Sequence, residues 1–270
     1  MQEYFYELTI TTHNPQIIAE LVLEITNEAI EEQDNSIIVR SKENLDDIQW
    51  AIEEFGKKAG IPLSTKLSKK KNEDWIKKYQ ESIKPIQVGS FYIRPSWETP
   101  KKELIDIIIN PALAFGSGHH ETTSSCLEAI EKYVKENDKV LDVGCGSGIL
   151  SIAAAKLNAK VDICDTDPLA VESAKENFKL NKVSFNKAWV GSVNDTEEEY
   201  DTVIANIIAD ILIILSKDLK QRVKKNGYLI LSGILDKYID EVKKKFDNFD
   251  TIATLKKAEW FTLVLKNSQR

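Results

Sequence analysis

The stretch that decides the fold of this chain is Lys139-Val140-Leu141-Asp142-Val143-Gly144-Cys145-Gly146-Ser147-Gly148. Its first five residues form an apolar run that predicts a strand, and a helix is predicted to begin at about residue 149. The three alternate glycines between them allow a tight turn and a close approach of the backbone to a ligand. In a doubly wound α/β sheet, ligands bind at such a turn, beyond the carboxyl ends of the strands.

The segments on both sides of this stretch alternate between strand and helix patterns. Strands are predicted at 88–95, 104–109, 161–165, 183–190, 202–205 and 228–232, and helices at 122–134, 149–157, 170–180, 237–246 and within 207–223. Such alternation predicts an open, mostly parallel sheet with helices on both faces. Two closing strands, at 251–255 and 260–265, are joined by a short turn, so that end of the sheet is predicted to be antiparallel.

Residues 1–67 are predicted to form a separate small α/β domain. Strands at 4–10, 36–40 and 63–67, with helices from Asn14-Pro15 and at 45–55, match a ferredoxin-like module in size. Residues 68–84 carry a charged run with Trp75 and Tyr79, which we interpret as a linker helix. The alternative is a surface helix whose two aromatic side chains pack on a neighbour. Residues 85–270 then form the larger domain.

Composition excludes several classes of protein. The chain has 270 residues, 42% of them hydrophobic and 29% charged, which is typical of a soluble globular protein. A net charge of −7 argues against a protein that coats nucleic acid, so we expect no direct nucleic-acid partner. The three cysteines have no CxxC spacing, which predicts neither disulfides nor a metal site. No signal peptide or membrane-spanning run is visible, so a cytoplasmic location is expected.

The ligand predicted at the glycine loop contains a ribose. Asp165 ends the next predicted strand, about 20 residues after Gly144, where a carboxylate accepts hydrogen bonds from ribose hydroxyls. The loop reads G-x-G-x-G rather than the dinucleotide pattern G-x-G-x-x-G, and Asp142 suits a sulfonium or ammonium group better than a pyrophosphate. These features favour an adenosyl amino acid over the alternative, a turn that only connects a strand to a helix. We interpret Cys145 as a small loop residue, not a nucleophile.

Four segments carry a resemblance to a known family. Residues Asp142 to Ala154 resemble the first motif of class I, Rossmann-like methyltransferases. More narrowly, the chain is similar to the ribosomal protein L11 methyltransferase family, through Asn110-Pro111-Ala112-Leu113-Ala114-Phe115-Gly116-Ser117-Gly118-His119-His120-Glu121-Thr122-Thr123, Asp165-Thr166-Asp167-Pro168-Leu169-Ala170-Val171 and Ala205-Asn206-Ile207-Ile208-Ala209. The resemblance implies S-adenosylmethionine as the cofactor. It also implies methyl transfer to lysine side-chain and/or N-terminal amino groups of a large-subunit ribosomal protein.

The resemblance also assigns site residues. It places cofactor contacts on Thr123, Gly144, Asp165 and Asn206, to which the loop itself adds Asp142 and Gly146. Thr123 is predicted in the first turn of a helix, where its hydroxyl and the helix N-terminus suit a carboxylate; plain capping is the alternative. Asn206 is our candidate catalytic residue, because its amide oxygen at a strand end suits orienting an amine. The alternative is that Asn206 only holds the cofactor or caps the next helix.

Other expectations concern the partner and the rival functions. The family's small N-terminal domain recognises the protein substrate, which implies that residues 1–67 bind a basic ribosomal protein; we expect a monomer. His120 could shuttle a proton, although a lone His is more often structural. Asn110, His119, Glu121, Asp210 and Ile211 depart from the family's segments and concern the substrate entrance. The rival functions are a class I methyltransferase acting on a small molecule or a nucleic-acid amine, and a non-catalytic nucleoside-binding module.

Overall fold

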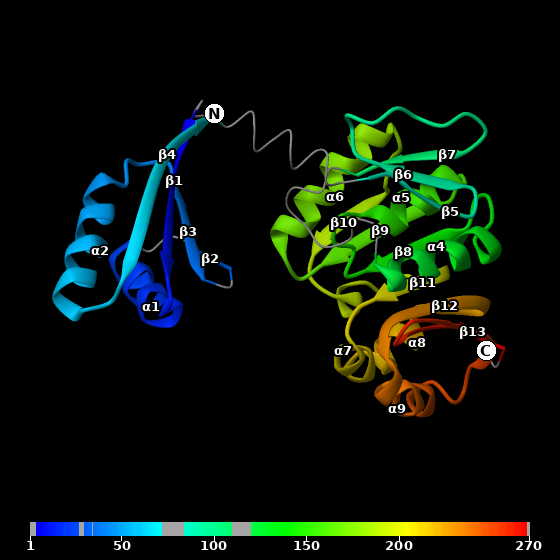
Figure 1. The fold of residues 1–270 in the computed structure, drawn as a ribbon. Helices are drawn as coiled ribbons and strands as arrows, with labels where there is room; N and C mark the ends of the chain where they lie inside the picture. Colours follow the sequence, from blue (N-terminus) through cyan, green and yellow to red (C-terminus); the bar gives the residue numbers. More distant parts are fainter. Residues whose placement is uncertain (1–3, 27–29, 34, 72–83, 110–119, 269–270) are drawn as a thin grey trace. The chain divides into compact units, whose positions relative to one another are not determined.

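The computed structural model describes residues 4–26, 30–33, 35–71, 84–109 and 120–268 (Figure 1). The chain forms two compact units, residues 1–83 and 84–270. Within the described residues, no helix is both long enough and apolar enough to cross a membrane.

The N-terminal unit is a four-stranded antiparallel sheet with two helices. In chain order its elements are β1 (Tyr4–Thr12), α1 (Pro15–Thr26), β2 (Ile30–Gln33), β3 (Ser36–Ser41), α2 (Asp46–Ala59) and β4 (Leu63–Lys71). The strand order β2-β3-β1-β4 with this β-α-β-β-α-β sequence is the ferredoxin-like arrangement, which confirms the predicted module. Strand β2 was not predicted from the sequence, because its four residues are mostly polar and show no apolar alternation.

One layer of apolar side chains joins this sheet to its helices. Leu8 and Ile10 alternate inward along β1 and pack with Ile18 of α1 and Ile52 of α2. The predicted strand 63–67 is longer than expected, because β4 continues to Lys71 and pairs there with Tyr4 of β1. The first four residues of the predicted linker helix 68–84 are therefore strand, held by cross-strand hydrogen bonds that a local charge pattern does not reveal. Residues 72–83 of the predicted linker helix, including Trp75 and Tyr79, lie outside the described residues.

The larger unit is built on a seven-stranded sheet in the order β10-β9-β8-β11-β12-β14-β13. The strands are β8 (Lys139–Val143), β9 (Lys160–Asp165), β10 (Lys187–Val190), β11 (Tyr200–Asn206), β12 (Val223–Leu235), β13 (Asp250–Lys257) and β14 (Trp260–Lys266). The first five strands in this order are parallel, and β14 runs antiparallel to both β12 and β13. Both the mostly parallel sheet and its antiparallel end are confirmed.

Helices cover both faces of this sheet (Figure 1). The helices are α4 (Glu121–Tyr133), α5 (Ile149–Lys156), α6 (Pro168–Asn181), α7 (Ala209–Ile214), α8 (Ser216–Gln221) and α9 (Ile239–Lys245). Residues of α4, α5 and α6 pack with Val140 and Ile204 on one face, and residues of α7, α8 and α9 pack with Leu141 and Val203 on the other. Successive side chains of one buried strand thus pack into hydrophobic cores on opposite faces of the sheet. This explains why the sequences of these strands are continuous apolar runs.

One strand prediction in the larger unit was wrong in detail. The single strand predicted at 88–95 is a hairpin of β5 (Ile86–Val88) and β6 (Phe91–Arg94), with β7 (Ile105–Ile108) beside β6. The turn falls at Gly89, whose φ of +53° suits a residue without a Cβ. The stretch 207–223, predicted to contain a helix, holds the two short helices α7 and α8, and its last residue belongs to β12.

Candidate functional site

A cavity of about 700 Å³ lies at the carboxyl ends of β8, β9 and β11. Five of the six residues predicted for the site line it: Thr123, Gly144, Gly146, Asp165 and Asn206. They come from four elements or loops that are distant in sequence. The parallel order β9-β8-β11 brings them together, because the carboxyl ends of parallel strands meet at one edge of the sheet.

The glycine loop has a backbone that only glycine adopts without strain. Gly144, Gly146 and Gly148 have φ angles of +73°, +53° and +78°. A Cβ on Gly144 would lie 2.5 Å from Cγ2 of Ile207, so a larger residue has no room there. The loop is anchored to β9, since the backbone N–H groups of Gly144 and Cys145 both donate to the carbonyl of Cys164, at 2.9 and 3.0 Å.

The carboxylate of Asp165 is held against the glycine loop. Its Oδ2 accepts a hydrogen bond from the backbone N–H of Gly146 at 3.0 Å, and Oδ1 accepts one from Asp167 at 3.0 Å. An ionised carboxylate has about four lone-pair sites, so two of them remain for a ligand in the cavity. The position and orientation of Asp165 are therefore suited to vicinal hydroxyl groups.

Asp142 does not line the cavity. Its side chain is buried, and Oδ2 accepts a hydrogen bond from the backbone N–H of Ser151 at 3.2 Å. Oδ1 has no hydrogen-bond partner among the described residues. Burial raises the pKa of this carboxyl to about 6; hydrogen bonds from Ser151 lower it and the charge of Asp165 raises it. Direct contact between Asp142 and a ligand is thus not part of the observed geometry.

The start of α4 contributes the other side of the cavity. His120 caps the helix through Nδ1, which accepts from the backbone N–H of Thr122 at 3.3 Å and lies 2.8 Å from its Oγ1. The ring stands edge-on to that of Trp260, with centroids 5.0 Å apart. His120 thus has a capping role, and Nδ1 is occupied by it. Of the resemblance segment 110–123, residues 110–119 lie outside the described residues.

Thr123 and Asn206 meet in the cavity although they are 83 positions apart in sequence. Thr123 lies in the first turn of α4, as predicted, and its Oγ1 accepts a long hydrogen bond of 3.5 Å from Nδ2 of Asn206. Asn206 is the last residue of β11. With its nitrogen turned toward Thr123, the amide oxygen of Asn206 is the atom that remains for a hydrogen-bond donor in the cavity.

Several residues that line the cavity were not predicted from the sequence. Gly191 and Ser192 follow β10, Ile207 and Ile208 follow β11, and Trp260 begins β14. The Gly-Ser pair at the end of a predicted strand was a usable signal, because strand ends meet at this edge. No local signal marks Trp260, which reaches the cavity only because β14 returns beside β12.

The cysteines and the possible metal ligands among the described side chains bear on whether the cavity supports other chemistry. Cys145 lines the cavity, but burial strongly raises the pKa of its thiol, which disfavours the nucleophilic thiolate. This agrees with its interpretation as a small loop residue. In the part of the chain that the structure describes, no group of three or more His, Cys, Asp or Glu side chains is placed to hold a metal ion.

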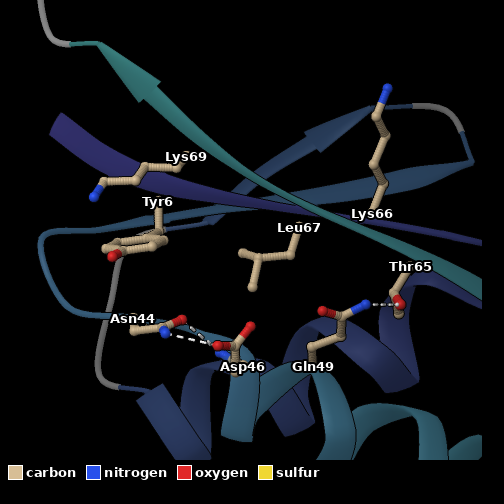
Figure 2. Close-up of a pocket in the computed structure, with 8 residues that line it drawn as sticks. All are labelled: Tyr6, Asn44, Asp46, Gln49, Thr65, Lys66, Leu67 and Lys69. Atoms are coloured by element: carbon tan, nitrogen blue, oxygen red, sulfur yellow. Dashed lines mark hydrogen bonds between the residues drawn. The ribbon is translucent and has the colours of Figure 1, made fainter.

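A second, more open hollow of about 440 Å³ lies in the N-terminal unit (Figure 2). Leu67 and Tyr6 reach into it from the strands, and Asn44, Asp46 and Gln49 border it from the start of α2 (Figure 2). The side chain of Asn44 donates to Asp46 at 2.6 Å, and that of Gln49 donates to Thr65 at 2.8 Å. The polar groups of this hollow are largely paired with one another.

Known proteins resemble the chain over its whole length. A model of the family described as ribosomal protein L11 methyltransferase (PrmA) matches residues 7–268. The ribosomal protein L11 methyltransferase of Campylobacter fetus is 49% identical, over 100% of this chain and 99% of its own. That of a Nitratiruptor species is 50% identical, over 100% and 98%. The crystal structure of ribosomal protein L11 methylase from Lactobacillus delbrueckii has a TM-score of 0.64 and 31% identity, covering 67% of this chain and 97% of its own.

Proposed function

The chain belongs to the ribosomal protein L11 methyltransferase family, and from this premise we propose that it methylates amino groups of ribosomal protein L11. It is an S-adenosylmethionine-dependent methyltransferase. The rival substrates, a small molecule or a nucleic-acid amine, are not favoured, because relatives about half identical over their full length bear the name of a protein methyltransferase. The monomeric state and the cytoplasmic location stay predictions.

The residues of the cavity fit S-adenosylmethionine. The glycine loop leaves no room for a Cβ at Gly144, Asp165 presents free acceptor sites, and Asp142 holds an unpartnered buried oxygen behind the loop. When bound, the cofactor supplies an electrophilic methyl group on a sulfonium. We propose that Asp165 accepts hydrogen bonds from its ribose, that Gly144 and Gly146 allow the loop backbone to approach it, and that Asp142 attracts its cationic groups through the loop.

Thr123 and Asn206 are proposed to act as a pair. The hydroxyl of Thr123, at the N-terminus of α4, suits the carboxylate of the cofactor, because backbone N–H groups there favour negative charge. Thr123 orients the side-chain nitrogen of Asn206, so that Oδ1 of Asn206 faces the acceptor amine. A hydrogen bond from the amine to Oδ1 then aligns the lone pair of the amine for in-line attack. A lysine amine must lose its proton to attack, yet its ordinary pKa is about 10.4. The site must therefore favour the neutral amine.

The N-terminal unit is proposed to recognise the protein substrate. Its first 71 residues contain thirteen Asp and Glu against eight Lys and Arg, so most of the net charge of −7 lies in this quarter of the chain. An acidic unit attracts a basic ribosomal protein and speeds its encounter with the enzyme. The KM for ribosomal protein L11 is then expected to rise with salt, whereas the Kd of S-adenosylhomocysteine stays nearly constant.

The observation that carries the proposal is the convergence of Gly144, Asp165 and Asn206 on one cavity in a chain of this family. The test is incubation of the protein with radiolabelled S-adenosylmethionine and purified ribosomal proteins. We expect the label on ribosomal protein L11, and an Asn206→Ala variant should lose most turnover while it still binds S-adenosylhomocysteine. Labelling of a different component, or of none, would refute the substrate assignment.

A further inference from the structure

Helix α7 carries apolar side chains on two opposite faces. Ala209 and Leu212 are 3% and 0% exposed and face the core, together with helices α8 and α9. Ile208, Ile211 and Ile214 recur every third residue and are 62%, 38% and 70% exposed. A surface helix normally directs polar residues to solvent, so this second apolar face needs an explanation other than the core of this unit.

The exposed isoleucines belong to the wall of the methyl-transfer cavity. All three line it, and Ile208 lies two positions after Asn206, the proposed amine-orienting residue. They therefore present exposed apolar surface in the wall of the cavity, close in sequence to Asn206. Apolar side chains grouped beside a cavity are typical of a binding surface, whereas exposed apolar residues scattered singly need no explanation.

We propose that Ile208, Ile211 and Ile214 form the docking surface for the segment of the protein substrate that carries the target amine. This inference rests on the proposed function, and it names the occupant as a polypeptide whose reacting side chain has a long aliphatic stem. A lysine side chain has that chemistry, since four methylene groups precede its nitrogen. The isoleucines contact the stem and neighbouring apolar groups, while the amine reaches Asn206.

The same surface favours the reactive form of the amine. Removing an ammonium group from water disfavours its charged form and lowers its pKa. Among the described residues, the titratable groups that line the cavity are His120, Cys145 and Asp165, and Asp210 lies on α7 itself. The charge of Asp165 acts in the opposite direction, but it is identical in every variant compared below. Replacing the isoleucines with polar residues should therefore raise the apparent pKa of the bound amine.

The test compares a double glutamine variant with a matched control. Ile211→Gln with Ile214→Gln keeps side-chain length and helix propensity while it removes the apolar surface. The control is Leu180→Gln on α6, which also lies on a helix, is 37% exposed and does not line the cavity. KM and kcat are measured with purified ribosomal protein L11 across pH, and calorimetry gives the Kd of S-adenosylhomocysteine.

The double variant is expected to raise the KM for ribosomal protein L11 about tenfold, with an unchanged Kd for S-adenosylhomocysteine. The apparent pKa in the pH profile of kcat/KM should rise, and Leu180→Gln should match the wild type. An unchanged KM and pH profile would overturn the proposed docking surface. A loss of S-adenosylhomocysteine affinity as large as the rise in KM would also overturn it, because α7 would then only shape the cofactor site. A wild-type protein that labels no ribosomal protein would instead overturn the proposed function.

Discussion

Replacing Asp142 with Asn should stabilise the larger unit at neutral pH, although it removes a charge from behind the glycine loop. The side chain of Asp142 is buried, its Oδ1 has no partner among the described residues, and burial raises its pKa to about 6 from an ordinary 3.8. The folded protein therefore binds a proton at this site more tightly than the unfolded chain does. The stability that this bound proton adds to the folded state is complete below about pH 4 and is lost as the pH rises through 6.

The size of the effect follows from the difference in pKa. About two pKa units at 1.36 kcal/mol per unit correspond to about 3 kcal/mol of destabilisation above pH 7. An amide carries no charge, so Asp142→Asn avoids this cost, and its oxygen can still accept from the N–H of Ser151. Its NH2 group takes the unpartnered position, which costs about 1 kcal/mol. The net gain expected at pH 7.5 is about 2 kcal/mol.

The assay is differential scanning calorimetry of the ligand-free protein between pH 4 and pH 8. The transition of the larger unit is identified as the one that S-adenosylhomocysteine raises. A gain of about 2 kcal/mol raises the Tm of a unit of this size by roughly 4–8 °C, and the gain should vanish near pH 4. Because other groups titrate in the same range, the quantity to compare is the difference between variant and wild type at each pH.

Asp162→Asn is the matched control. Asp162 is also a buried strand carboxylate, but both its oxygens are partnered: Tyr200 Oη donates to Oδ2 at 2.9 Å and the N–H of Lys187 donates to Oδ1 at 3.0 Å. An amide cannot accept both bonds, so this variant should lose stability. The reasoning is refuted if Asp142→Asn is no more stable than the wild type at pH 7.5, or if its gain does not depend on pH.

Three further predictions concern other contacts. Gly144→Ala should lower the free energy of unfolding by about 2 kcal/mol or more and weaken S-adenosylhomocysteine binding. Gly60 has a similar φ of +67°, but no atom of the described residues lies within 4 Å of an added Cβ, so Gly60→Ala should cost only about 1 kcal/mol. Chemical denaturation measures the two losses of stability, and calorimetry measures the binding. Tyr200→Phe should lose about 1–2 kcal/mol, because Oδ2 of Asp162 then loses its hydrogen bond from the Tyr200 hydroxyl; equal stability in urea unfolding would contradict this. Burial alone would raise the pKa of Glu7, but its hydrogen bonds and ion pairs with Lys70 and Arg40 lower it overall. The stabilising effect of the Glu7 carboxylate should therefore be present above about pH 4.5 and be lost as the pH falls through its folded pKa. The thermal stability of Glu7→Gln should therefore fall less steeply in acid than that of the wild type.

Features that depend on neighbouring residues were predictable from the sequence. The glycine turn at 144–148 and the strands with continuous apolar runs both follow from local backbone preferences and hydrophobic periodicity. Asp165 was also predictable, because a strand end one unit after the glycine loop must lie beside it in a parallel sheet. Where local patterns are weak, as in β2 and the lysine-rich end of β4, the prediction missed a strand or ended it too early.

The sequence by itself therefore determined the kind of sheet, the position of its ligand-binding turn and five of the residues that line the cavity. Only the tertiary structure decided that β11 lies beside β8, which brings Asn206 to Thr123, and that β14 returns beside β12, which brings Trp260 to the cavity. It also decided that Asp142 is buried behind the loop and that Ile211 faces the cavity rather than the core. The physical reason is that strand order and burial depend on contacts between residues far apart in the chain, which no local spacing specifies.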